Sequence, residues 1–229
     1  MIRENLLSPQ PRYTNLLGAL PENNFLVKKT TELDYGLLWH VVPTSTPRII
    51  RKCSRCDRDR FHSSDKFRVN ANKKLIDVWL IYKCVHCDAT LNLLIINRRP
   101  ITKIEADLLN CLQSNDTALC WQYAFSSNLF QKGIKMDWDI DIVVKTEILD
   151  NPIVCKALDK IQIQIKSQYN LKIPIFSVLR VKMQMSRAQL EKLQKKQALE
   201  IFNLNGEPLV LKNSLGSGCI LVVSNLLQI

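Results

Sequence analysis

The residues with the clearest chemistry in this chain are two pairs of cysteines with the same spacing. Cys53 and Cys56 form one Cys-x-x-Cys pair, and Cys84 and Cys87 form the other, with residues 57–83 between them. Each short turn places two sulfurs on one side of an ion, so the two pairs can surround one tetrahedral metal. Two redox pairs or four unrelated buried thiols are the alternatives, and the repeated spacing favours the metal site.

Four cysteine thiolates are typical of a structural zinc site, although iron accepts the same ligands. Four protein ligands leave no coordination position open, so this metal would stabilise a fold and not catalyse a reaction. Binding energies of about 10 to 16 kcal/mol exceed what a small module's core supplies, so we expect metal removal to unfold the module. His62 and His86 can each replace a ligand, but four cysteines leave both histidines a surface role.

The segment between the two pairs predicts a hairpin that brings them together. Lys66–Asn70 and Leu75–Lys83 have the composition and alternation of strands, with a turn at residues 71–74. A third strand is expected at Leu91–Ile96. The stretch therefore predicts an antiparallel four-cysteine zinc ribbon.

An aspartate follows each cysteine pair. Many zinc ribbons have glycine at this position, because the backbone there has a positive φ. Asp57 and Asp88 stand there in this chain, and aspartate tolerates that conformation better than most residues do. Both turns can therefore form.

Composition and charge point to a folded protein with a polyanionic partner. The chain has 229 residues, 46% of them hydrophobic, and a formal net charge of +11 from 32 basic and 21 acidic residues. Basic residues are in excess in 48–103 and 160–229, whereas 104–159 is acidic. Two basic blocks around an acidic one favour contact with a polyanion through two modules, and a generally basic protein without such a partner is the alternative.

The remaining cysteines indicate a reducing compartment. Cys111, Cys120, Cys155 and Cys219 lie among apolar residues and are expected to be small buried side chains. Unpaired thiols beside a zinc ribbon favour the cytoplasm. No apolar run reaches the roughly 18 residues of a membrane helix, and residues 16–20 are too short for a signal-peptide core.

The acidic middle segment predicts two helices and a strand. Thr102 and Glu105 form a capping-box pattern for a helix that ends near Gln113, and residues 114–116 break it and cap a second helix. Residues 137–142 alternate as a strand, which places Asp137, Asp139 and Asp141 on one face; such carboxylates can bind magnesium or calcium. Carboxylates roughly 6.5 to 7 Å apart along a strand cannot share one ion without help, so a solvated face is the favoured interpretation.

The C-terminal part predicts an ordered series of strands, helices and turns. The expected elements are a strand at 161–166, a helix at 177–185, a helix at 187–197, strands at 199–203 and 208–211, and a turn at 216–218 before a last strand. Ser186 is the expected cap of the second helix, and Asn205-Gly206 is the expected hairpin turn. Leu190 and Leu193 lie on one side of this helix and its basic residues on the other.

This order resembles the small S4-type RNA-binding domain. The matching positions are Ser186-Arg187, Leu190, Leu193, Asn205-Gly206 and Gly218. The family usually has glycine near Gln197 and an acidic residue at Cys219. In that family the basic helix lies along structured RNA. The resemblance therefore implies RNA contacts by a set of basic residues: Arg187, Lys192, Lys195, Lys196 and Lys212.

From Trp39 onward the chain also resembles a family of bacterial proteins catalogued as domain of unknown function 1062. The matching stretches are Trp39–Pro47, Arg51–Cys53, Ser64–Cys87 and Asp137–Asp139. This resemblance implies no particular activity.

The predicted fold is α+β, built of small modules. We expect a poorly ordered leader at 1–35, a zinc-ribbon domain at 36–103, an acidic helical and strand segment at 104–159, and an S4-like domain at 160–229. Our first hypothesis is a cytoplasmic, non-catalytic zinc protein that binds structured RNA, with ribosomal and transfer RNA as the candidates by analogy.

Two other functions stay open. The alternative is a protein-interaction or regulatory adaptor whose ribbon docks a partner. A metal-dependent enzyme that uses Asp137, Asp139 and Asp141 is the least favoured, because the three histidines lack metal-ligand spacing and no glycine-rich phosphate loop is present. We predict no membrane contact and no small-molecule substrate.

Overall fold

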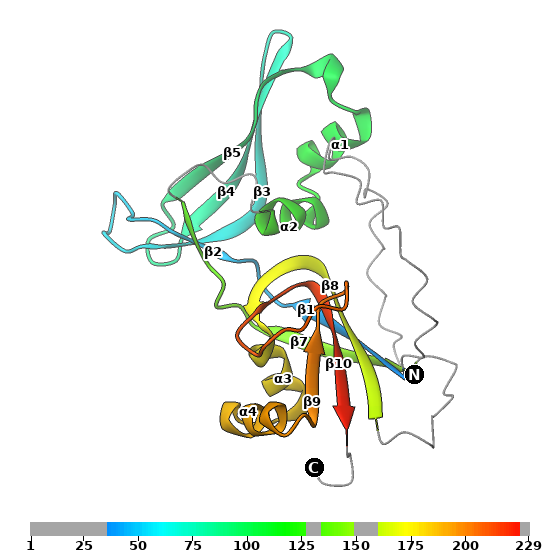
Figure 1. Ribbon diagram of the computed structural model, residues 1–229. Helices are drawn as coiled ribbons and strands as arrows, with labels where there is room; N and C mark the ends of the chain where they lie inside the picture. Colours follow the sequence, from blue (N-terminus) through cyan, green and yellow to red (C-terminus); the bar gives the residue numbers. More distant parts are fainter. Residues whose placement is uncertain (1–35, 127–133, 149–159, 225–229) are drawn as a thin grey trace, which may run out of the picture.

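The computed structural model describes residues 36–126, 134–148 and 160–224, and contains two five-stranded sheets and four α-helices in these ranges (Figure 1). The α+β class is confirmed. The predicted leader at 1–35 and Cys155 lie outside the described residues. Among the helices described, none is long and apolar enough to span a membrane.

The first sheet contains strands from both ends of the described chain. Its strand order is β7 (Ile142–Ile148), β1 (Leu37–Pro43), β8 (Lys160–Pro174), β10 (Ser214–Ser224) and β9 (Leu199–Phe202). β1 and β8 are parallel, and the other neighbours are antiparallel. We call this sheet A.

The second sheet, sheet B, is antiparallel and carries the cysteine pairs. Its order is β5 (Thr90–Pro100), β4 (Leu75–Cys84), β3 (Arg60–Asn72), β2 (Arg48–Ile50) and β6 (Lys135–Asp137). The long hairpin β3–β4 turns at residues 73–74, where Lys73 has a φ of 57°. Every second residue of β4 from Ile76 to Cys84 is buried, as the alternating sequence predicts.

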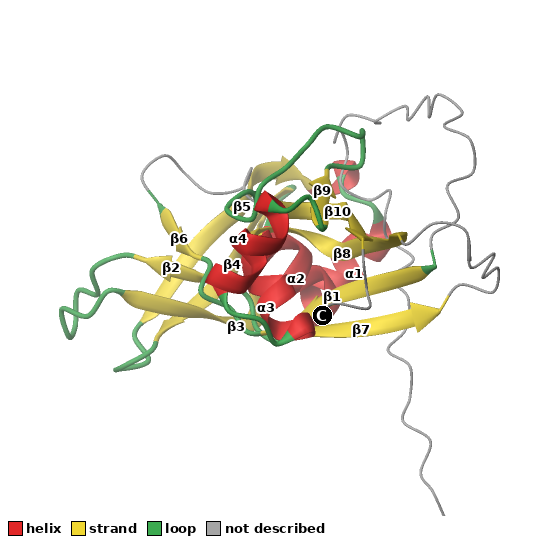
Figure 2. Ribbon diagram, turned by 60° about the horizontal axis from the view of Figure 1, so that its bottom comes forward, coloured by secondary structure: helices red, strands yellow, loops and turns green. Residues whose placement is uncertain are grey.

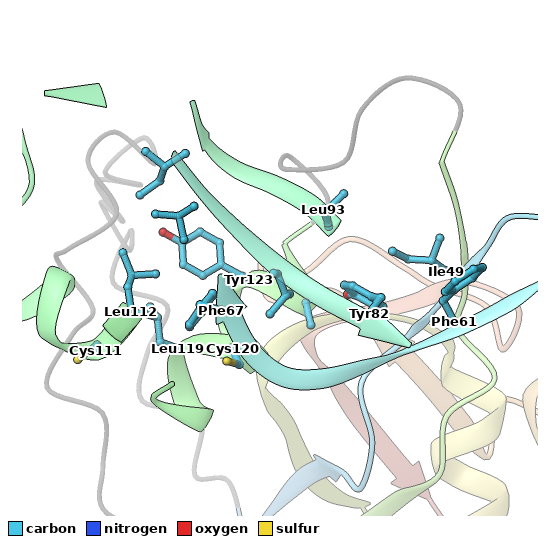
Figure 3. Close-up of a cluster of buried hydrophobic side chains, with 14 of the residues drawn as sticks. Ile49, Phe61, Phe67, Tyr82, Leu93, Cys111, Leu112, Leu119, Cys120 and Tyr123 are labelled. Atoms are coloured by element: carbon cyan, nitrogen blue, oxygen red, sulfur yellow. The ribbon is translucent and has the colours of Figure 1, made fainter. Parts of the chain in front are cut away.

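Two helices cover the buried face of sheet B. After a short 3-10 turn, η1 (Ile101–Lys103), come α1 (Ala106–Ser114) and α2 (Thr117–Phe125). Figure 3 shows the core between these helices and the sheet, where Phe67 and Tyr123 make an edge-to-face contact with ring centroids 5.8 Å apart. Asn115 fixes the corner between the helices, because its Oδ1 accepts the N–H of Phe67 at 2.7 Å.

Sheet A is covered by α3 (Ile175–Met183) and α4 (Arg187–Lys195) (Figure 2). Val178, Leu179 and Leu190 from these helices are fully buried against the sheet. Gly218 is required in β10, because a Cβ there would lie 2.2 Å from the carbonyl oxygen of Ile165. The close pairing of β10 with β8 depends on this glycine.

Helix α2 contacts both sheets (Figures 1 and 2). Its Leu119 and Cys120 belong to the core of sheet B, whereas Phe125 belongs to the core of sheet A. Phe125 stacks on Tyr169 of β8 with ring centroids 4.3 Å apart. The acidic middle segment therefore supplies the helix that joins the two cores.

All four predicted helices are present. Asp116 caps α2 by accepting the N–H of Leu119 at 2.7 Å, and Ser186 begins α4 with a capping box that includes Gln189. The capping box expected at Thr102 is wrong: the N-cap of α1 is Glu105, three residues later, and Glu105 makes no side-chain cap bond.

Three strand and turn predictions are also wrong. Residues 138–141 connect β6 in sheet B to β7 in sheet A, so 137–142 is not one strand. The expected strand at 208–211 is reduced to one bridge between Phe202 and Pro208. Residues 216–218 lie inside β10, where the register shifts, and do not form a turn.

Candidate metal centre

The four cysteine sulfurs lie together at one end of sheet B. Their Sγ atoms are all within 4.8 Å of one another, with 3.7 Å between Cys53 and Cys87 and 3.6 Å between Cys56 and Cys84. A tetrahedral ion with metal–sulfur bonds of 2.3 Å requires sulfurs about 3.8 Å apart. The donor set and its spacing therefore agree with a tetrahedral metal site.

The two cysteine turns, which we call the knuckles, have equivalent backbone hydrogen bonds. Asp57 donates its N–H to the carbonyl of Cys53, and Asp88 donates to Cys84, both at 3.1 Å. The N–H of each first cysteine donates in turn to the residue after the aspartate, Cys53 to Arg58 at 2.6 Å and Cys84 to Ala89 at 2.9 Å. The aspartates have φ values of 60° and 56°, which confirms the predicted left-handed conformation.

The β3–β4 hairpin brings the knuckles together. The first knuckle connects β2 to β3, and the second connects β4 to β5. Phe61 pairs with Cys84 in register, and Val85 donates its N–H to the carbonyl of Arg60 at 3.0 Å. Arg55 adds a direct link, because its Nη1 donates to the carbonyl of Cys87 at 3.4 Å.

The local electrostatics lower the pKa of some of the four thiols and raise the pKa of others. The pKa of Cys53 is lowered to about 7, chiefly because the backbone N–H of Arg55 stabilises the thiolate. The pKa of Cys84 is also lowered, chiefly by the N–H of His86. At Cys56 the N–H of Arg58 lowers the pKa, but burial and the three other thiols outweigh it and raise the value to about 12. Crowded thiolates repel one another, and a divalent cation among them would remove that conflict.

The three predicted carboxylates do not gather into a second site. Asp137 at the end of β6 binds Arg60, with Nε to Oδ2 at 3.0 Å, and its Oδ1 accepts the N–H of Asp139 at 3.1 Å. Asp141 follows in the connection, where its carbonyl accepts the N–H of Thr44 at 2.9 Å. Among the residues that the structure describes, the four cysteines are the one cluster of at least three potential metal ligands.

Four of the basic residues named for RNA contact lie in α4 or at its C-cap, and Lys212 lies beside the first turn of α3. All five are exposed: Arg187, Lys192, Lys195, Lys196 and Lys212. Arg187 pairs with Glu191 at 2.8 Å, one turn along the helix. Lys212 lies in the connection between β9 and β10, between Leu211, which accepts the N–H of Phe176, and Asn213, which accepts that of Ile175.

One basic residue beside this set was missed from the sequence. Arg180 on α3 and Arg187 on α4 both lie over the ring of Phe176, at 6.0 and 5.9 Å from its centroid. Phe176 and Arg180 are one turn apart on the same helix, which is the spacing that could have identified the pair. Arg187 joins them only because α4 packs against α3.

The comparisons with known proteins identify a family. The model of the family described as Protein of unknown function (DUF1062) matches residues 69–203, which include the second knuckle, α1 to α4 and β9. A search of curated proteins found no match, and a search of solved structures found none either. The family match covers more than half of the chain, and the protein therefore belongs to the DUF1062 family.

Proposed function

We propose that this chain is a non-catalytic zinc protein that binds structured RNA. Zinc is the favoured metal because it takes four thiolates in tetrahedral geometry and closes the site. The sulfur spacing of 3.6 and 3.7 Å across the knuckles supports such an ion. The metal would hold Cys53, Cys56, Cys84 and Cys87 and stabilise one end of sheet B.

The observation that carries RNA binding is a group of unpaired lysines on α4. Lys192, Lys195 and Lys196 fall within about 100° of one another around the helix axis, opposite the buried Leu190. None of the three lysines forms an ion pair with a residue that the structure describes. Lysines that are held by no carboxylate are free to neutralise phosphates and release their counterions.

The local backbone supports the S4-like interpretation of this region. α3, α4 and β9 follow one another, and the Asn205-Gly206 turn and β10 come next. Gln197 has a φ of 57° at the end of α4, the left-handed conformation for which the S4-type family uses glycine. In this interpretation α4 lies along the RNA, and shape supplies most of the recognition, because the grooves of duplex RNA offer little base readout.

The test is RNA binding by the zinc-loaded full chain across a salt series. Five phosphate contacts would give a slope of log K against log salt of about −4. A variant with Arg187, Lys192, Lys195 and Lys196 changed to glutamine should flatten this slope to about −1. The charge-matched control changes four exposed lysines elsewhere, Lys103, Lys135, Lys145 and Lys166, to glutamine and should keep a steep slope.

Weak binding that is equal in the wild type and the α4 variant would remove the proposal. In that case the adaptor hypothesis would stand, with a protein docked on the ribbon. Val85 favours the ribbon as that docking site, because this apolar side chain between the two cysteines of the second knuckle is 54% exposed.

A further inference from the structure

The outer face of sheet B combines an aromatic ring with basic side chains. β4 buries one row of side chains and turns the other row, which includes Trp79, Ile81 and Lys83, away from α1 and α2. In register with this row are Lys66 opposite Ile81 and Arg68 opposite Trp79 on β3, and Leu94 opposite Trp79 on β5. We call this surface the platform: Lys66, Arg68, Trp79, Ile81, Lys83 and Leu94.

The centre of the platform is apolar and partly open to solvent. Trp79, Ile81 and Leu94 are half-buried. Among the residues that the structure describes, no helix packs on this row as α2 packs on the opposite face. The guanidinium of Arg68 lies 5.7 Å from the centroid of the Trp79 ring. A ring beside a guanidinium offers a planar surface for stacking and a cation next to it.

The charge of the platform is positive and largely unpaired. Lys66 and Arg68 are exposed, and neither forms an ion pair with any residue in the described ranges. Lys83 donates from its Nζ to the hydroxyl of Thr90 at 2.7 Å, and this bond leaves its charge uncompensated. Asp77, in the same row of β4, accepts the backbone N–H of Arg98 at 2.7 Å.

We propose that the platform binds unpaired nucleotides of RNA, with a base stacked on Trp79 and phosphates held by Lys66, Arg68 and Lys83. The proposal rests on the proposed RNA-binding function and adds a second, separate contact with a different substrate class. α4 carries lysines but no aromatic residue, so its surface suits the phosphate backbone of structured RNA. The platform has an aromatic ring flanked by cations, and this arrangement suits single-stranded RNA. This stacking is tolerant of sequence, because every base has a π face.

Two RNA probes separate this contact from the one on α4. The first is a blunt hairpin, and the second is the same hairpin with a 3′ tail of about eight uridines, within the range of single-strand binding sites. The zinc-loaded wild-type chain should bind the tailed hairpin about tenfold more tightly. Trp79→Ala and Arg68→Gln should lose this gain and keep the affinity for the blunt hairpin.

Conservative and matched variants control for folding and for net charge. Trp79→Phe keeps an aromatic ring and should retain most of the gain from the tail. Lys145→Gln removes one exposed charge from β7 in sheet A and should leave the gain unchanged. Should Trp79→Ala fail to fold, tryptophan fluorescence still decides the question: uridine-tail binding should quench the wild type, and the quenched component should be missing in Trp79→Phe.

The outcomes distinguish the two contacts. Equal affinity of the wild type for both hairpins, or equal quenching in the wild type and Trp79→Phe, overturns the platform and leaves RNA binding by α4 intact. Failure to bind either hairpin overturns the proposed function together with the platform. A tail effect that is lost in Trp79→Ala and Arg68→Gln but not in Lys145→Gln supports the assignment.

Discussion

At the scale of single residues, the geometry of the candidate metal centre depends on two aspartates in a conformation that non-glycine residues rarely adopt. Asp57 and Asp88 close the knuckles with φ values of 60° and 56°, and each donates its N–H to the carbonyl of the cysteine four residues earlier. Aspartate adopts the left-handed region more readily than most non-glycine residues. Because both turns use the same bonds, the sulfur positions follow from the local backbone, and the hairpin only has to bring the turns together.

Tyr82 is a single residue whose hydroxyl works against stability. Its side chain is fully buried in the core of sheet B, and its hydroxyl has no hydrogen-bond partner among the described residues. Burial raises the pKa of Tyr82, so the group stays neutral and its cost is that of an unpaired hydroxyl. We expect Tyr82→Phe to raise the free energy of unfolding by about 1 kcal/mol, measured by urea denaturation.

The control for Tyr82 removes the ring as well as the hydroxyl. Tyr82→Leu should lower the free energy of unfolding, because the ring fills space between the sheet and α2. A loss of stability in Tyr82→Phe would contradict the interpretation and would point to a bound water that satisfies the hydroxyl.

At the scale of elements, α4 ends in a left-handed backbone conformation that a glutamine, Gln197, adopts in place of glycine. The helix begins with the Ser186 capping box and ends at Lys195, and Gln197 then has a φ of 57°. Glycine reaches this conformation without the steric cost of a Cβ. The helix that carries the exposed lysines therefore has a stabilising N-terminal cap and a strained backbone at its C-terminal end.

We expect Gln197→Gly to raise the free energy of unfolding by up to about 1 kcal/mol, because the substitution removes that strain. The comparison variant is Gln194→Gly inside α4, which should lower stability by about 1 kcal/mol through helix propensity. Urea midpoints of the two variants should therefore move in opposite directions. A destabilising Gln197→Gly would mean that the Gln197 side chain makes contacts worth more than the backbone strain.

Local patterns predicted the elements that depend on local forces. The caps at Asp116 and Ser186 were predictable because the bonding groups are three residues apart. The two cysteine turns were predictable for the same reason, since each knuckle is a short turn with local backbone bonds. The pattern at Thr102 failed because the chain makes a 3-10 turn there, which ends where Ile104 donates to Ile101 at 3.0 Å.

Local sequence patterns did not predict which strands, distant in the chain, pair with one another. Residues 137–142 alternate as one strand, yet Arg60 holds Asp137 in sheet B while Ile142 pairs with Pro43 in sheet A. Alternating polarity indicates which side chains face a core. It does not indicate that the chain leaves sheet B after Asp137 and enters sheet A at Ile142. The parallel pairing of β1 with β8 has no local signature either, so the set and order of strands in sheet A could not be predicted.

At the scale of the whole molecule, the candidate metal centre lies at one edge of a large core. The knuckles contribute Cys53 and Cys84 to the core of sheet B, which also includes Leu112 and Tyr123 from α1 and α2. The expectation that metal removal unfolds the ribbon considered only the small core of the hairpin itself. In the structure the two helices cover that hairpin, and α2 connects it to sheet A through the stacked pair of Phe125 and Tyr169.

This architecture changes the result expected on metal removal. The purified chain should contain one zinc ion, measured by elemental analysis, and a chelator should remove it. Without the metal, no ion links the sulfurs of the two knuckles, and the short turns lose the bonds that join them. The hairpin residues Phe67, Val78 and Leu80 remain covered by α1 and α2, and burial of this kind is the dominant stabilising contribution in folding. We therefore expect local opening of the knuckles and not the unfolding of the whole β3–β4 hairpin.

Hydrogen exchange followed by mass spectrometry measures this directly. After chelation, peptides that cover 51–59 and 84–89 should lose their protection, because the bonds of Asp57 to Cys53 and of Asp88 to Cys84 depend on closed knuckles. Peptides that cover 76–82 should keep theirs, and so should peptides from β8 and β10, which serve as the internal control in sheet A. A simultaneous loss of protection in 76–82 would show that the metal holds the entire sheet B core together.

Iron in place of zinc in the purified protein would overturn the identity of the metal but not the four ligands, because both ions accept the same thiolates.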